Sequence, residues 1–305
     1  RATPDQIEQI ANDKEVAFVE ENQEWSIDAQ TTATGVPRIY APSNPNIHIN
    51  GTHDYIVDAD VAVIDTGIDF DHPDLNVVHV INCNLSGPLE GTCSGAQDDG
   101  NGHGSHVAGI IGALDNDFGV VGIAPGVRLW AVKVLTNQGY GTTAQIIAGI
   151  DYVAAHAADI EVANMSLGGT AESLAMDLAI SKAVALGVTF SLAAGNSNID
   201  VSNYHPAGNP DAITVSALAD FDGLAGGLAA PTCYTDIDDT RANFSNYGAG
   251  VTIAAPGVCI YSTFKDGAYT TKSGTSMAAP YVAGAAALLA STNLYDPYQI
   301  RDILT

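Results

Sequence analysis

Basic residues are scarce in this sequence. Its 305 residues contain 10 lysines and arginines against 35 aspartates and glutamates, which gives a formal net charge of −25. Proteins that bind nucleic acids need clustered lysine and arginine, so the composition argues against that partner. No apolar run reaches the roughly 18 residues that a membrane-spanning helix needs, so we expect no membrane partner either. The excess of carboxylates instead predicts a strongly hydrated surface, suited to salty water or to cation binding.

Cysteine is also scarce, and its spacing argues against a zinc site. The four cysteines, at positions 83, 93, 233 and 259, form no CxxC pair. An even number suggests two disulfides, and the local pairing among three possible ones is Cys83–Cys93 with Cys233–Cys259. Two disulfides would indicate an oxidising setting outside the cytoplasm. Four buried free thiols are the alternative.

The first 60 residues differ in composition from the rest. Residues 1–28 are charged and predict a helix ending at Asp13 and a strand at Val16–Glu20, too little to form a core. Residues 29–60 are rich in Pro, Asn and Thr with little periodicity, which predicts loop. This break is the candidate domain boundary. Because the chain begins at Arg1 without a Met or a signal peptide, we expect a piece excised from a longer precursor.

From Val61 onward, apolar strands alternate with helices of roughly 10–15 residues. Strands that are apolar throughout are typical of parallel sheets buried on both faces. We therefore predict an α/β fold in three layers, with a mostly parallel sheet flanked by helices. The predicted strands are 61–64, 129–135, 162–167, 188–194, 212–217 and 251–255, and the predicted helices are 103–114, 144–155, 173–186, 276–291 and one starting at 297.

Polar residues lie at the carboxyl ends of three predicted strands: Asp65 ends one, Ser166 lies at the end of another, and Asn196 follows a third. In such sheets function gathers at the carboxyl ends of the strands. His103 opens a helix of small residues, and Ser276 lies at a helix start, where free N–H groups favour developing negative charge. Alone, each residue has an ordinary alternative: Asp65 and Asn196 as turn residues and Ser276 as a helix cap.

Two other interpretations of the stretch around His103 are weaker. His103 and His106 are three residues apart, as in some metal pairs, but no third His or Cys sits at a suitable spacing. Glycines at 100, 102, 104 and 109 weakly resemble a phosphate loop, but no strand directly precedes them. We therefore disfavour nucleotide binding.

Together, three long motifs in the order Asp65, His103, Ser276 resemble the subtilisin-like serine proteases, or subtilases. The motifs are Asp-Thr-Gly-Ile-Asp, His-Gly-Ser-His-Val-Ala-Gly and Gly-Thr-Ser-Met-Ala-Ala-Pro, and Ser105 replaces the more usual Thr. The resemblance covers nearly the whole chain from about Ala29. It implies a serine endopeptidase in which Ser276 is the nucleophile, His103 the general base and then acid, and Asp65 the residue that holds the imidazole tautomer.

The resemblance assigns further roles around these three residues. Asn196 matches the oxyanion-hole residue, which acts with the backbone N–H of Ser276. Two short segments resemble the walls of the pocket for the residue before the scissile bond, and a third resembles the strand that pairs with protein or peptide substrates. Because the walls are small, we expect broad specificity with an apolar preference. The substrate-binding residues are Gly139, Tyr140, Gly141, Ile146, Ser166, Leu167, Gly168, Ala193, Ala194 and Gly195.

A calcium site comes with the same resemblance. The matching positions offer only oxygen ligands, which suits Ca²⁺, and the alternative is a solvated acidic loop. A second, weaker cation site is expected near Ala207 and Asn209, after a cis His205–Pro206 bond. The calcium ligands implied are Gln30, Asp74, Asn116 and the backbone carbonyls of Leu114, Phe118 and Val120.

Residues 1–28 resemble the C-terminal part of the family's inhibitory propeptide, and residues 29–305 the catalytic domain. We predict self-cleavage between Asp28 and Ala29, with Trp25 in the outer apolar pocket, although Asp28 departs from the apolar preference and leaves the cut open. The resemblance implies a secreted monomer inhibited by its own propeptide. The rivals are a narrowly processing or exo-acting subtilase and a catalytically inactive homologue that acts as a binding or inhibitory protein.

Overall fold

The computed structural model describes residues 30–39 and 49–305, together with isolated positions before residue 49 (3, 6, 9, 12–14, 43 and 47). The strand expected at 16–20, Trp25 and the cleavage position lie outside the described residues, as does most of the helix expected before Asp13. The described part of residues 29–60 is loop, as predicted, apart from the short helix α2 (Gly35–Arg38).

The predicted α/β fold is confirmed. Eight strands form one sheet in the spatial order β2-β3-β1-β4-β5-β6-β7, with β8 also paired to β6. All pairings are parallel except that of β6 with β7. The strands are β1 (Asp60–Asp65), β2 (Val77–Asn82), β3 (Arg128–Lys133), β4 (Val162–Met165), β5 (Thr189–Ala193), β6 (Ile213–Ala219), β7 (Thr240–Arg241) and β8 (Ile253–Pro256).

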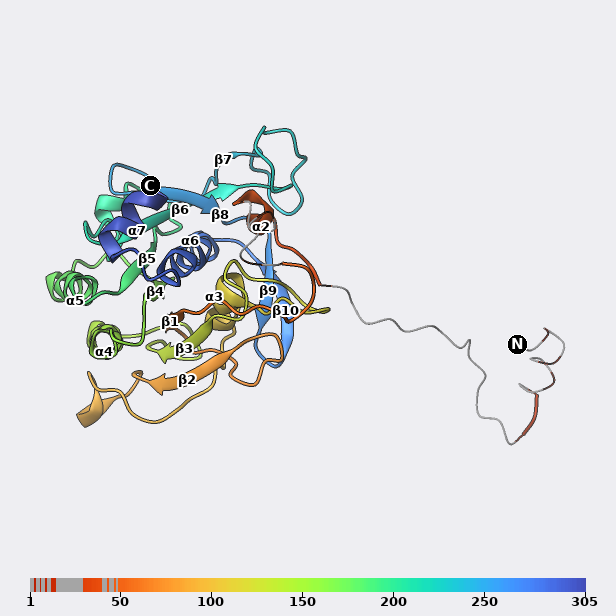
Figure 1. Cartoon of the computed structure of the whole chain (residues 1–305), viewed down its shortest axis with the longest axis horizontal. Helices are drawn as coiled ribbons and strands as arrows, with labels where there is room; N and C mark the ends of the chain where they lie inside the picture. The colour runs from red at the N-terminus through yellow and green to blue at the C-terminus, as the bar shows by residue number, and fades with distance from the viewer. Residues whose placement is uncertain are drawn as a thin grey trace.

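Helices cover both faces of this sheet, which gives the three layers (Figure 1). One apolar cluster packs α3 (His103–Gly112) and α6 (Thr275–Ala290) against the sheet. A second cluster packs α4 (Thr143–Ala155) and α5 (Leu174–Ala185) on the opposite face. The last helix is α7 (Pro297–Leu304). The predicted ends of the helices and strands differ from these bounds by at most two residues.

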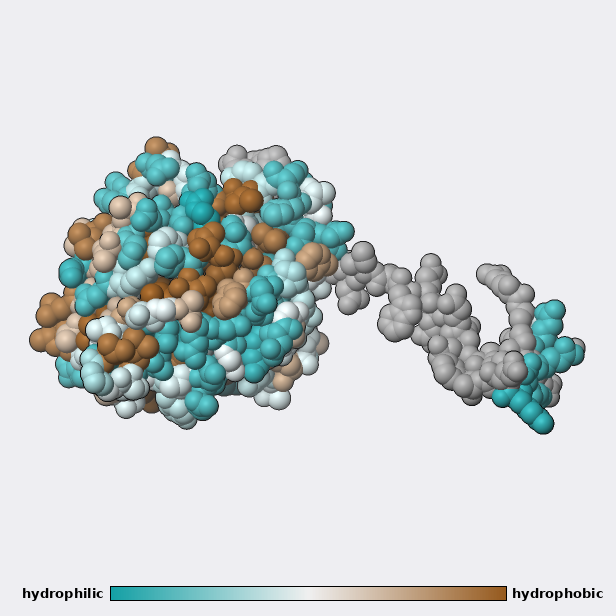
Figure 2. All heavy atoms as spheres, turned by 90° about the horizontal axis from the view of Figure 1, so that it is seen from below, coloured by the Kyte–Doolittle hydropathy of each residue, from teal (hydrophilic) through white to brown (hydrophobic). Residues whose placement is uncertain are grey.

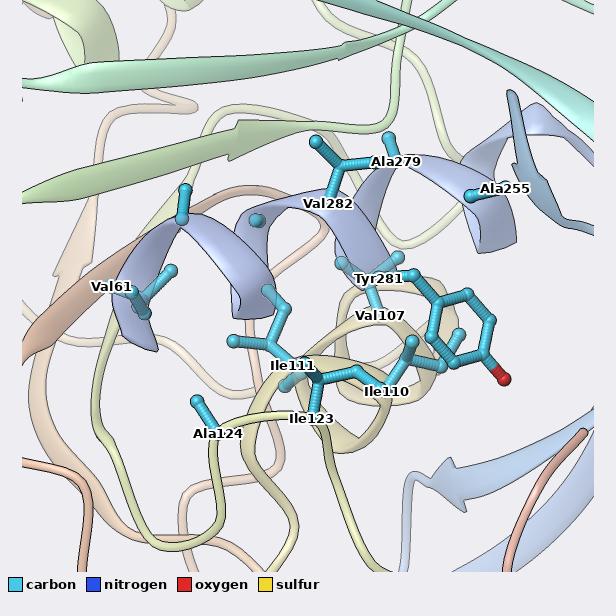
Figure 3. Close-up of a cluster of buried hydrophobic side chains, with 14 of the residues drawn as sticks. Val61, Val107, Ile110, Ile111, Ile123, Ala124, Ala255, Ala279, Tyr281 and Val282 are labelled. Carbon is cyan, nitrogen blue, oxygen red and sulfur yellow. The ribbon is translucent and has the colours of Figure 1, made fainter. Parts of the chain in front are cut away.

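The helices α3 and α6 pack closely, and this contact brings their first turns to the same side of the sheet. Tyr281 of α6 lies beside Val107 and Ile110 of α3 (Figure 3). A methyl group on Gly284 of α6 would lie 3.2 Å from the carbonyl oxygen of Ile111 in α3 and 2.6 Å from Cβ of Ile123 in the loop after α3, so a glycine is needed for this approach.

The sequence analysis missed strand β2, the two-residue strand β7 and a hairpin outside the main sheet, formed by β9 (Ile260–Phe264) and β10 (Ala268–Lys272). No residue of β2 is fully buried, so it lacks the apolar run used to find the other strands. The hairpin lies beside α3 (Figure 1), where the His106 Nε2–H donates to the carbonyl oxygens of Ile260 and Thr270 at 3.1 Å each. Hydroxyls of Ser262 and Thr263 donate to α3 backbone carbonyls. These hydrogen bonds attach the hairpin to α3 although its sequence is largely polar.

The structure contains both disulfides of the predicted local pairing. Cys83–Cys93 closes the loop after β2, and Cys233–Cys259 joins the long loop after β6 to the turn before β9. The His205–Pro206 bond is cis, as expected.

The face of the molecule seen in Figure 2 carries both polar and apolar side chains. On the face shown in Figure 2, hydrophilic side chains surround a group of apolar ones near the middle of the body. Among the helices that the structure describes, none has both the length and the apolar character needed to cross a bilayer.

Candidate active site

Three segments that are distant in sequence end at the carboxyl edge of the sheet. Strand β1 ends at Asp65, helix α3 begins at His103, and Ser276 lies in the first turn of α6. Nδ1 of His103 lies 2.8 Å and 3.0 Å from the two carboxylate oxygens of Asp65. Because a carboxylate only accepts, Nδ1 carries the hydrogen, and Nε2 is left with a lone pair. This is the tautomer that a general base requires.

The Asp65 carboxylate is fully buried, so its charge depends on these donors. Besides His103, it accepts the backbone N–H of Thr66 at 2.7 Å. A methyl group on Gly104 would lie 2.0 Å from the carbonyl oxygen of Gly67, so a glycine is needed for α3 to approach the end of β1 this closely.

The pKa of His103 lies above its usual value of 6.5. Burial of the ring lowers this pKa, but the charge of Asp65 and its hydrogen bond raise it by more, and the charge of Lys272 partly offsets this rise. A base of raised pKa is a stronger proton acceptor while remaining largely neutral above that pKa.

A second buried carboxylate, Asp99, fixes the start of α3, and the sequence analysis did not identify it. It accepts the N–H of Gly102 at 2.9 Å, the N–H of Ser105 at 3.0 Å and the hydroxyl of Ser105 at 2.7 Å. It also accepts the hydroxyl of Thr66 at 2.9 Å. Asp99 therefore acts as a remote N-cap for α3, and it uses the hydroxyl that Ser105 shares with the more usual Thr.

Ser276 makes two contacts with Ser166 at the end of β4. Its hydroxyl donates to the Ser166 carbonyl at 3.2 Å, and the Ser166 hydroxyl donates to the Ser276 carbonyl at 2.9 Å. Pro280 lies inside α6 and has no N–H for the carbonyl four residues earlier, so the Ser166 hydroxyl takes that place. Among the hydrogen bonds of the described residues, none joins Ser276 to His103. Such contacts often form only when substrate binds, and a rotation about the Cα–Cβ bond redirects the hydroxyl.

The amide of Asn196 is oriented by Thr275. Its Oδ1 accepts both the N–H of Thr275, at 2.8 Å, and the hydroxyl of Thr275, at 3.0 Å. A backbone N–H can only donate, so the atom facing Thr275 is the oxygen. The NH₂ group therefore faces the other way, and it donates to no other residue in the described part of the chain. Asn196 thus contacts Thr275, the residue before Ser276, and its NH₂ group is a free donor.

A cavity of about 450 Å³ opens beside His103. Most of the expected substrate-binding residues line it, whereas Ala193, Ala194 and Gly195 do not. The ring of Tyr204 explains the difference, because it lies against both Gly168 and Gly195 and fills the space between the two expected walls. Tyr204 was not identified from the sequence. The lining residues foreseen from the sequence are His103, Gly139, Tyr140, Gly141, Ile146, Ser166, Leu167 and Gly168.

Comparison with known proteins decides the family. The sequence model of the subtilase family (peptidase S8) matches residues 58–305. The chain belongs to the subtilase family. It is 37% identical to the alkaline protease of Shouchella clausii over 303 residues, which are 99% of this chain and 71% of that protein. It is 41% identical to subtilisin DY of Bacillus licheniformis over 266 residues, 86% of each protein.

A solved structure, a cold-adapted subtilisin-like serine proteinase, superposes with a TM-score of 0.68 at 38% identity over 84% of each chain. Both the fold and the sequence are therefore those of a subtilase, and the protein is a serine endopeptidase.

In this subtilase the residues expected to bind calcium lie together. Asp74 is fully buried and accepts Nδ2 of Asn116 at 2.8 Å and the N–H of Val120 at 2.9 Å. Gln30 donates to the Leu114 carbonyl at 3.0 Å, and the N–H of Phe118 donates to the side chain of Asn116 at 3.1 Å. Gln30 and Asp74 thus lie against the loop after α3, which holds the other four expected ligands.

No basic side chain pairs with Asp74 in the described part of the chain. Burial raises the pKa of Asp74 to about 6, although three hydrogen bonds oppose the rise. The Asp74 carboxylate accepts hydrogen bonds from Asn116, Val120 and Tyr269 but lacks a cationic partner. A buried carboxylate without a counter-charge, next to residues that also carry amide and carbonyl oxygens, fits a calcium ion, which would supply the missing charge.

Two further groups of carboxylates lie close together and were not identified from the sequence. They are Asp69, Asp71 and Asp98, and Asp220, Asp222 and Asp238; within each group the oxygens lie within 4.8 Å of one another. At the second expected cation site, Asn209 donates to the carbonyl of Asp177 at 3.2 Å and accepts the N–H of Asp211 at 3.0 Å. That site stays a prediction.

The raised pKa of His103 can be measured directly. In a Ser276→Ala background, which prevents self-digestion, we expect the His103 ring protons to titrate in NMR spectra with a pKa above 6.5. Asp65→Asn should lower this pKa, because it removes the negative charge that favours the imidazolium. The exposed Asp151→Asn should leave it unchanged. A His103 pKa that does not respond to Asp65→Asn would contradict the described electrostatics.

Proposed function

We propose that this subtilase hydrolyses peptide bonds through Asp65, His103 and Ser276 and passes through an acyl-enzyme. The observation that carries the proposal is the Asp65–His103 hydrogen bond, which leaves a lone pair on Nε2 beside a cavity. Ser276 supports it from the first turn of α6, where its own backbone N–H can donate to an anion.

The proposed reaction begins when the Ser276 hydroxyl turns from the Ser166 carbonyl toward Nε2 of His103. Oγ attacks the carbonyl carbon of the scissile bond while its proton passes to Nε2. The oxyanion accepts the NH₂ of Asn196 and the N–H of Ser276. The imidazolium then protonates the leaving amine as the C–N bond breaks, and a water molecule hydrolyses the acyl-enzyme by the same steps in reverse.

The proposed specificity is broad with an apolar preference, and it is limited by Tyr204. The cavity is lined by Leu135, Ile146 and Met176, whose side chains favour apolar groups. The glycines at 139 and 141 leave the backbone open for pairing with an extended substrate. Since the ring of Tyr204 fills space between the two walls, side chains smaller than a phenyl ring would fit best before the scissile bond.

An inactive homologue that serves only for binding is the second candidate. The four side chains Asp65, His103, Asn196 and Ser276 are all those that hydrolysis requires, and Asn196 keeps its NH₂ free of protein partners, which favours the active enzyme over a binding protein.

We propose that Gln30, Asp74, Asn116 and the carbonyls of Leu114, Phe118 and Val120 hold a calcium ion. Bound calcium would neutralise the buried Asp74 carboxylate and fix the loop after α3 to the segment at Thr31, whose N–H donates to the Gly119 carbonyl at 2.7 Å. Its contribution would be to stability, since this loop lies outside the cavity.

Residues 1–28 are proposed to be the end of an inhibitory propeptide, with residues 29–305 as the catalytic domain and the cut between Asp28 and Ala29. We also propose that the enzyme is secreted. The two disulfides support this, because such bonds persist in oxidising compartments. A monomeric state and inhibition by the propeptide remain predictions of the family resemblance.

Replacing the nucleophile tests the proposed reaction. The wild-type enzyme should cleave peptides and react with a fluorophosphonate probe, and Ser276→Ala should lose both the labelling and nearly all turnover. Asn196→Ala should retain labelling but lose about 10²–10³ in kcat, a cost known from subtilisin itself. Ser291→Ala, at the far end of α6, serves as the control. Labelling that persists in Ser276→Ala would contradict the assignment of the nucleophile.

Removing the Tyr204 ring should enlarge the pocket. For matched peptides with Phe or Ala before the scissile bond, Tyr204→Ala should raise the Phe/Ala ratio of kcat/KM by roughly 10-fold or more, because a ring-sized volume becomes available. Tyr298→Ala, on the exposed surface of α7, should leave the ratio unchanged. A ratio unaffected by Tyr204→Ala would mean that the ring does not limit the pocket.

Chelation should destabilise the protein. In the Ser276→Ala background, we expect EGTA to lower the Tm by about 5–10 °C and added Ca²⁺ to restore it, since saturation at about 100 Kd contributes about 2.7 kcal/mol. Asp74→Asn should abolish the shift, whereas Asp117→Asn, an exposed carboxylate in the same loop, should keep it. A shift that survives Asp74→Asn would assign the ion to another site.

A further inference from the structure

Lysines gather around the candidate active site although basic residues are scarce in the chain. Of the ten lysines and arginines, three lie near His103: Lys133, Lys265 and Lys272. Lys133 is buried and donates to Thr66 and Asn137. Lys265, at the turn of the β9–β10 hairpin, donates to the carbonyl of Gly100 at 3.0 Å. Lys272, at the end of β10, is the remaining one, and it is half-buried.

Lys272 has no carboxylate partner. In the part of the chain that the structure describes, no Asp or Glu oxygen lies within 4.0 Å of its ammonium. The chain has 35 acidic residues against 10 basic ones, so an ammonium without a carboxylate partner is unexpected. Its Nζ lies over the ring of Phe264, 5.2 Å from the centroid, which orients the side chain but leaves the charge free to meet another anion.

Phe264 packs between the Lys272 ammonium and the start of α3. A methyl group on Gly102 would lie 2.2 Å from the Phe264 ring, so the ring packs directly on the residue before His103. Lys272 pairs in register with Ile260, whose carbonyl accepts the Nε2–H of His106 one turn further along α3. Burial is the main reason that the pKa of His106 falls to about 3, and the charge of Lys272 lowers it further, as expected of a cation near this helix.

The hairpin packs against the start of α3 but is separate from the cavity beside His103. The cavity beside His103 is lined by residues from the ends of β1, β3 and β4, from α4 and α5, and from the segment 204–206. No described residue of β9 or β10 lines it. If the cavity binds the residues before the scissile bond, the substrate chain continues past His103 along the hairpin. Lys272 then faces the first residues of the leaving group.

We infer that Lys272 is a specificity-determining residue that binds an acidic side chain at the first or second position after the scissile bond. The inference rests on the proposed function, because it assigns a preference to the same cleft. It predicts that this acidic enzyme favours peptides with Asp or Glu immediately after the cleaved bond. Elsewhere the net negative charge of the chain would repel such peptides.

The test uses quenched peptides that are identical before the scissile bond and carry Ala, Glu, Gln or Lys at both of the two following positions. For the wild-type enzyme at low salt, we expect kcat/KM for Glu to exceed that for Gln about fivefold, with Lys less favourable still, as for one charge pair near a solvated surface. The preference should nearly disappear at about 1 M salt, where the Debye length is about 3 Å.

Matched variants separate the charge from the fold. Lys272→Met keeps an unbranched side chain over Phe264 but removes the ammonium, and it should reduce the Glu/Gln ratio to less than about twofold, whereas Lys272→Glu should invert it. Lys265→Met removes the same charge at the other end of the hairpin and should keep the ratio. The peptides are compared well above the His103 pKa, because loss of the Lys272 charge raises that pKa. At such a pH the change should appear in kcat/KM for the charged peptides, while the Ala peptide is cleaved at nearly the wild-type rate.

Cleavage of the Ala peptide shows whether the inference about Lys272 fails alone or together with the proposed protease function. If the wild-type enzyme cleaves it but shows no preference for Glu over Gln, or if Lys272→Met keeps the preference, Lys272 only packs on Phe264 and the inference is wrong. If the Ala peptide is not cleaved at all and no fluorophosphonate labelling occurs, the proposed function fails and the inference fails with it.

Discussion

The buried carboxylate of Asp65 is the constraint on which the rest of this site depends. A charge with no exposed surface is costly to hold unless hydrogen bonds satisfy it, and here the donors are the Thr66 N–H and the His103 ring. The ring reaches Asp65 only if α3 begins within contact of the end of β1. The glycine at 104 permits that approach, and Asp99 caps the helix at the required place. The Asp65–His103 hydrogen bond thus depends on the positions of the end of β1, the loop at Asp99 and the start of α3.

The charges around this bond also suit the proposed reaction. Asp65 and Asp99 are both buried, and the only buried cation described beside them is Lys133, whose ammonium donates to the Thr66 carbonyl. Burial lowers the pKa of Lys133, while the charges of Asp99 and Asp65 oppose this. These three groups together carry one negative charge when ionised, so a proton arriving on His103 neutralises the set. The imidazolium that the proposed reaction forms on His103 would be stabilised by groups that are already in position.

Sequence alone predicted the layered α/β fold, the helix and strand ends to within two residues, and the family, because apolar runs and three long motifs are local signals. What it missed depends on contacts between distant segments. Strand β2 and the β9–β10 hairpin have no buried apolar run, since β2 lies at the sheet edge and the hairpin attaches to α3 through hydroxyl and carbonyl groups. Tyr204 gave no signal either, because its role depends on glycines at 168 and 195 that leave room for its ring. The four side chains proposed for catalysis were all identified beforehand, but the orientation of Asn196 by Thr275 was not.

The first turn of α6 illustrates how a local defect can serve a site. Proline in a helix interior removes one backbone hydrogen bond, and at Pro280 the group left over is the carbonyl of Ser276. The hydroxyl of Ser166 restores the bond from the end of β4, and the hydroxyl of Ser276 donates back to the Ser166 carbonyl. With a regular residue at 280, the helix would satisfy its own carbonyl and leave the Ser166 hydroxyl without this partner. The proline therefore couples the proposed nucleophile to a strand end that lines the cavity. The backbone of Ser276 is held by the sheet, and its hydroxyl can still rotate toward His103 in the proposed reaction.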